Sequence, residues 1–122
     1  MSQIRSGARP QRVGDLVQRE VARLMQFEVK DTRLGFMTVT EVRMSSDLRH
    51  ARVYVSFLAD GPARAEALRA LHGLRGFVRK RLGQTLHLRY TPEITFTLDT
   101  AIEYGAHIEH LLAETRHTED DG

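Results

Sequence analysis

The stretch HGLRGFVRKRLG, residues His72 to Gly83, places Gly73 and Gly76 three residues apart and follows them with a cluster of cations. Glycines at this spacing suit a turn that grips phosphate, because the missing side chains leave backbone N–H groups open to close approach. The same letters also suit a helix that bends and carries a solvated basic face. The spacing by itself leaves both interpretations open.

Helical patterns surround this stretch. One apolar stripe is expected between Ala63 and Leu82, and Gly83 is expected to cap its C-terminal end. Upstream, apolar residues recur at spacings of three and four from Pro10 to about Lys30, which predicts a first helix. Steps of seven, four and seven place four cations on roughly one face of that helix: Arg12, Arg19, Arg23 and Lys30.

Three strands are predicted between and after these helices. Phe36 to Met44 is rich in β-branched residues, and Ala51 to Leu58 alternates apolar with polar side chains, so the two form an antiparallel hairpin. Leu86 to Leu98 reads as a long strand that Pro92 interrupts, which implies an edge position or a bulge. Asp99 and Thr100 are expected to cap a last amphipathic helix that runs to about Ala113. Three strands beneath packed helices define an α+β two-layer sandwich.

Length and charge set the domain organisation. The 122 residues fit one domain over 10–114, preceded by a flexible arm, 1–9, and followed by an acidic disordered tail, 115–122. Residues 1–98 contain 17 Lys and Arg and 9 acidic residues, whereas the residues from Asp99 onward contain one Arg and seven acidic residues. A basic body with an acidic end is a pattern of polyanion-binding proteins, although a mixed-charge solvated surface explains it as well.

No persuasive catalytic or metal-binding set is present. His107 and His110 lie three residues apart near Glu103 and Glu114, but an exposed acidic helix explains this group better than a metal site. The sequence has no cysteine, no secretory signal and no apolar run of about 20 residues. We therefore expect a cytoplasmic protein without a cofactor, a membrane contact or enzymatic activity.

Several longer segments carry a family resemblance. RVGDLVQREVARLMQFEVKD, SSDLRHARVYVSF and RGFVRKRLG with LRYTPEITF resemble the bacterial ribosome-binding factor A family, and the likeness covers nearly all of residues 12 to 112. The resemblance implies a type II KH-like fold with a kinked helix pair. The family's kink is alanine-x-glycine, and here Leu74-Arg75-Gly76 stands in its place. This favours a kinked helix whose Gly76 permits the bend.

The resemblance implies a monomeric, non-enzymatic assembly factor. It would bind the free small ribosomal subunit, assist late maturation of 16S rRNA including its 5′ end, support growth in the cold and cooperate with ribosome-associated GTPases. The residues expected to contact RNA are Arg12, Arg19, Arg23, Lys30, Arg33, Gly73, Arg75, Gly76, Arg79, Lys80 and Arg81.

Two other classes compete with this function. One is a general KH-like binder of single-stranded RNA. The sequence argues mildly against it, because it shows no obvious exposed aromatic pair on which bases could stack. The other is a module that docks a protein partner through its sheet edge or its last helix.

Overall fold

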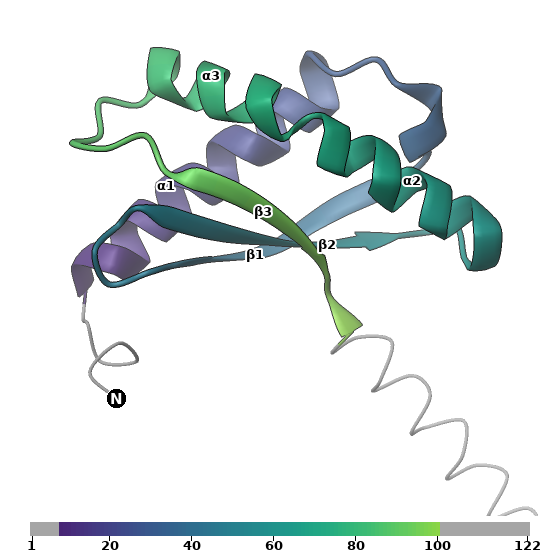
Figure 1. Ribbon diagram of the computed structural model, residues 1–122, viewed down its shortest axis with the longest axis horizontal. Coiled ribbons are helices and arrows are strands. Elements are labelled where there is room, and N and C mark those ends of the chain that lie inside the picture. The colour runs from purple at the N-terminus through teal and green to yellow at the C-terminus, as the bar shows by residue number, and fades with distance from the viewer. Residues whose placement is uncertain (1–7, 101–122) are drawn as a thin grey trace, which may run out of the picture.

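The computed structural model describes residues 8–100, which form two layers (Figure 1). In chain order the elements are α1 (Ala8–Phe27), the 3-10 turn η1 (Thr32–Leu34), β1 (Met37–Met44), β2 (His50–Phe57), α2 (Gly61–Gly73), α3 (Arg75–Thr85) and β3 (Glu93–Leu98). The helices cover one side of the sheet and leave the other side open. This is the predicted α+β two-layer sandwich, in the element order of a type II KH domain. The predicted last helix beyond residue 100 and the acidic tail lie outside the described residues.

The central strand, β2, organises the sheet. Its neighbours are β1, which is antiparallel to it, and β3, which is parallel. Alternate β2 residues Ala51, Val53 and Val55 are buried beneath the helices, whereas Arg52 on the opposite face is exposed. The predicted hairpin and its alternation are therefore confirmed.

The first helix is shifted relative to its prediction. It begins at Ala8 and ends at Phe27, because the N–H groups of Glu28 and Val29 both turn back to the Leu24 carbonyl oxygen. Val17, Val21 and Leu24 bury its apolar stripe in the core. Lys30 consequently lies beyond the helix, and the prediction that it shares a helical face with the three arginines is wrong.

The predicted long strand from Leu86 is also wrong in its first half. Helix α3 continues through Gly83 to Thr85, so Gly83 is not a cap, and strand pairing begins only at Glu93. A Cβ at Gly83 would lie 3.1 Å from the Thr91 hydroxyl oxygen, which shows how closely the connecting segment crosses the helix. Pro92 is buried immediately before β3, at the sheet edge where a missing N–H is tolerated.

The predicted kinked helix pair is confirmed, with the break at Leu74. This residue has φ −93° and ψ 2°, between the end of α2 and the start of α3. Gly73 and Gly76 do not adopt positive φ, so the bend does not depend on glycine's conformational freedom. Leu74 packs against the core, and the ring of His72 donates from Nε2 to the Phe96 carbonyl oxygen at 3.0 Å, which ties α2 to β3.

Alanine substitutions at two helical glycines test this packing. A Cβ at Gly14 would lie 3.0 Å from the Val42 carbonyl oxygen, whereas a Cβ at Gly76 would meet no atom within 4 Å. Gly76→Ala should therefore raise the free energy of unfolding by about 0.5–1 kcal/mol through helix propensity. Gly14→Ala should show a smaller gain or a loss, because the new methyl group crowds β1. Urea unfolding measures both, and equal stabilisation would contradict the close contact of α1 with β1.

Candidate nucleic-acid interface

A shallow hollow of about 380 Å³ lies on the outer side of α3. Gly76 and Gly83 are seven residues apart and so share one side of the helix. A Cβ at Gly76 would meet no atom within 4 Å, whereas the Thr91 side chain lies against Gly83. The remaining lining residues are Arg79, Lys80 and Thr91. The hollow thus combines bare backbone with two cations, an arrangement that admits a phosphate group closely.

The start of α3 adds positive potential near this hollow. Within residues 8–100, no side chain caps the first turn of α3. An uncapped helix start favours an anion, because its first N–H groups have no partner inside the helix. The Arg75 Nε–H donates to the His72 carbonyl oxygen at 2.9 Å, which holds this guanidinium beside the break. Arg79 donates to the Thr91 carbonyl oxygen at 3.3 Å and lies 3.7 Å from the Glu93 carboxylate. Both arginines remain exposed.

Further cations lie on and after α1. Arg12 and Arg19 are exposed on the helix, and Lys30 is exposed in the loop beyond it. Within residues 8–100, none of the three has a hydrogen-bond or ion-pair partner. The same holds for Lys80 in that part of the chain. These four charges are therefore uncompensated by local contacts.

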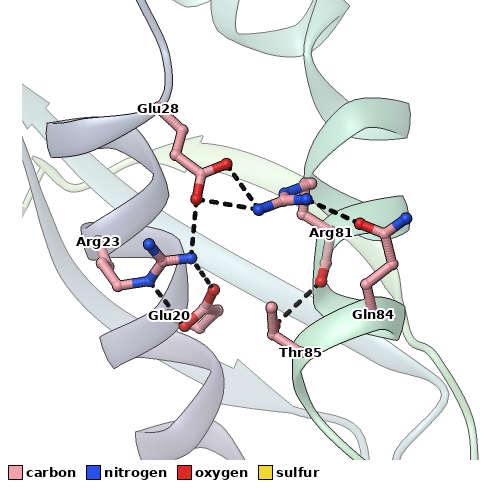
Figure 2. Close-up of polar contacts among 6 residues, drawn as sticks. All are labelled: Glu20, Arg23, Glu28, Arg81, Gln84 and Thr85. Atoms are coloured by element: carbon pink, nitrogen blue, oxygen red, sulfur yellow. Dashed lines mark hydrogen bonds and ion pairs between the residues drawn. The ribbon is translucent and has the colours of Figure 1, made fainter.

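Two other predicted RNA contacts join α1 to α3 instead (Figure 2). Arg23 Nη2 lies 2.6 Å from Glu20 and 3.0 Å from Glu28. Arg81 reaches the same Glu28 carboxylate at 2.8 Å and donates to the Gln84 side chain at 2.9 Å. Glu28 thus bridges guanidiniums from two helices, which gives Arg23 and Arg81 an interhelical role, and their contact with RNA stays a prediction.

These ion pairs shift the acidities of their members. Hydrogen bonds from Arg81 and then Arg23 hold the pKa of Glu28 below its ordinary value, and a hydrogen bond from Arg23 lowers the pKa of Glu20. Arg33 is similarly committed, because it donates to Asp31 at 3.0 and 2.6 Å and lowers the pKa of that carboxyl.

Sequence reasoning missed three neighbours of the interface. Gly83 and Thr91 line the hollow, although the sequence assigned them to a cap and to a strand. Phe77, directly after Gly76, is exposed, as are Phe27 and Phe36. These three rings lie on different elements, at the end of α1, before β1 and on α3, so the expectation about an exposed aromatic pair stays a prediction. A signal for Phe77 was available in the sequence, because it adjoins Val78 of the predicted apolar stripe, and adjacent helical residues face different directions.

Metal-ligating side chains do not gather in groups of three within residues 8–100, and His107 and His110 lie outside that range. In the same part of the chain, no helix is long and apolar enough to cross a membrane.

Three helices over a three-stranded sheet, with a break between α2 and α3, define the class of a type II KH-like α+β protein. The family model of ribosome-binding factor A matches residues 9–112, and the chain belongs to that family.

Individual relatives agree with this assignment. Ribosome-binding factor A of Moorella thermoacetica is 50% identical over 111 residues, covering 89% of this chain and 91% of the relative. The crystal structure of the Thermus thermophilus factor aligns with a TM-score of 0.68 at 27% identity, over 75% of this chain and 97% of that one. A second Thermus thermophilus coordinate set, fitted into a cryo-electron-microscopy map of a 30S complex, aligns with a TM-score of 0.63 at 27% identity, covering 75% and 96%.

The carboxylate that bridges α1 and α3 predicts a pH-dependent stability. Because the pKa of Glu28 is lowered in the folded state, its ion pairs stabilise the fold above the ordinary glutamate pKa of about 4.3 and are lost as the pH falls through the lowered value. Glu28→Gln should therefore unfold at lower urea than the unchanged protein at pH 7, and the difference should shrink below about pH 4.

Asp15→Asn, an exposed change on α1 without an interhelical contact, is the matched control and should leave this pH dependence unchanged. A Glu28→Gln deficit that stayed constant from about pH 7 to about pH 3 would show that packing, rather than the ion pairs, accounts for it.

Proposed function

We propose that this chain binds the small ribosomal subunit through the helix layer and acts there as an assembly factor. The observation that carries the proposal is the hollow in which Gly76 exposes backbone beside Arg79 and Lys80. Family membership supports the same partner, since a Thermus thermophilus member has been fitted into the map of a 30S complex.

The expected contact is with the rRNA backbone. Arg79 and Lys80 would meet phosphates at the hollow, the N–H groups at the start of α3 would add to them, and Arg12, Arg19 and Lys30 would contact a neighbouring segment. Such contacts position a protein but read little sequence, so selectivity comes from the shape of folded rRNA. Neutralising about six phosphates would reduce affinity roughly 10³-fold between about 50 and 200 mM salt.

The finer function rests on the family. We propose that the chain works without catalysis, as a cytoplasmic monomer, late in the maturation of 16S rRNA including its 5′ end. Growth at low temperature would depend on it most, and ribosome-associated GTPases would act on the same particle. The basic interface supports this role because an assembly factor needs to hold folded rRNA without cutting it.

A general binder of single-stranded RNA is the second candidate, and the exposed side chain of Phe77 favours it. This ring follows Gly76 directly, so a base could stack on it while the neighbouring phosphate occupies the hollow. Comparable affinity for short oligonucleotides and for the small subunit would support this candidate over the assembly factor.

Removing the two cations of the hollow tests the proposed interface. Arg79→Ala with Lys80→Ala should weaken co-sedimentation with free small subunits and reduce the slope of log affinity against log salt by about two. Arg52→Ala is the matched control, because Arg52 is exposed on the opposite face of the sheet. It should retain both the affinity and the slope.

The pattern of losses distinguishes the outcomes. If Arg52→Ala weakened co-sedimentation with small subunits and the double variant did not, the interface would lie on the open face of the sheet. That result would overturn the proposed contacts. Absence of the unchanged protein from the small-subunit fractions at both low and raised salt would overturn ribosome binding itself.

A further inference from the structure

An apolar pair lies uncovered at one end of the open sheet face. Phe36 immediately precedes β1 and Leu58 immediately follows β2, and their side chains are 72% and 82% exposed. The Leu58 N–H donates to the Phe36 carbonyl oxygen at 2.9 Å, so the backbone holds the two residues opposite each other. Their chain neighbours Met37 and Phe57 pack against the core, which directs Phe36 and Leu58 to the other face. We call this pair the Phe36–Leu58 patch.

A groove of about 520 Å³ lies between α1 and the edge of β1, next to Phe36. Phe36 borders it, together with Met25 and Val39. The exposed pair is therefore continuous with further apolar surface instead of being an isolated side chain. A segment with several apolar residues would be needed to shield this apolar surface from water.

The end of β3 points the following segment toward this patch. Leu98 pairs with Val55 in the parallel register, and the Asp99 N–H donates to the Val55 carbonyl oxygen at 2.7 Å. The Asp99 carboxylate also accepts a hydrogen bond from the Thr40 hydroxyl on β1, so it reaches across the central strand. Figure 1 shows the tip of β3 turning away from the helices. The last residues of the strand and Asp99 thus lie beside β2 and point along it toward Leu58.

The sequence beyond that point has the matching chemistry. Tyr104, Ile108 and the pair Leu111-Leu112 recur at spacings of four and three, which places them on one stripe of the predicted amphipathic helix. Leu58 lies three strand residues past Val55, about 10 Å along the sheet. A helix that begins near residue 100 rises about 12 Å by residue 108. The length of the predicted helix up to residue 108 therefore matches the distance from Val55 to Leu58.

We infer that residues 101–112 dock on the Phe36–Leu58 patch of their own chain. The apolar stripe covers Phe36 and Leu58 and extends toward the groove beside β1. Glu103 and Glu114 lie off that stripe and stay in solvent. The acidic end is then anchored at the open face of the sheet, on the side opposite the helix-borne cations, and does not compete with phosphate for Arg79 and Lys80.

A spin label tests the docking in the full-length chain. The sequence contains no cysteine, so His110→Cys gives a single attachment point on the polar side of the stripe. In protein labelled with nitrogen-15, the nitroxide should abolish most of the amide signal of Phe36, Thr38, Ser56 and Leu58. The amide signals of residues in α2 and α3 should keep their intensity.

Two variants and one mixture make the result decisive. Phe36→Ser with Leu58→Ser should restore the lost signals, whereas Phe77→Ser, an exposed apolar change on α3, should not. Uniform signals throughout, or losses confined to α3, would overturn the inference. The mixture combines isotope-labelled protein that lacks the nitroxide with spin-labelled protein that lacks the isotope. Signal losses there would assign the cover to a second copy and overturn the inference equally.

Discussion

The break at Leu74 is the constraint on which the proposed interface depends. Helix α2 is held on the sheet by Ala70, Leu71 and the hydrogen bond from His72 to β3, whereas α3 is held by Val78 and Leu82. One non-helical residue between them lets α3 turn toward α1 and leaves its first N–H groups uncapped. A continuous helix would bury those donors in its own hydrogen bonds. The helix start that the proposed interface uses therefore exists only because the helix stops.

Charge compensation then decides which cations remain for a ligand. Arg23 and Arg81 share Glu28, and Arg33 is paired with Asp31, so three of the arginines on the helix layer and its loops are already balanced. Arg12, Arg19 and Lys80 have no such partner in the described part of the chain. Counting basic residues overstates the positive field, because a paired guanidinium contributes little at a distance.

Local pattern predicted most of the fold, but much less of the site. The alternation around Val53 and the stripe through Val17 follow from periodicity alone, and the kink followed from the glycines together with the family resemblance. The features that the sequence did not predict depend on tertiary contacts. The close crossing of Thr91 over Gly83 accompanies the longer α3 and the shorter β3, and no local signal marks it. Likewise, the pairing of Arg81 with Glu28 joins residues 53 positions apart, so it needs the relative placement of two helices.

The ion-pair network also shapes what the interface can recognise. Because Glu28 bridges α1 and α3, the exposed cations on the two helices are held at a fixed separation across a neutral seam. A single flexible strand needs only one row of charges, whereas two rows at fixed spacing fit phosphates on two strands or on two turns of a folded RNA. In the proposed interface the seam would contribute to selectivity without touching the ligand, because it would favour an RNA whose backbone spacing is already set.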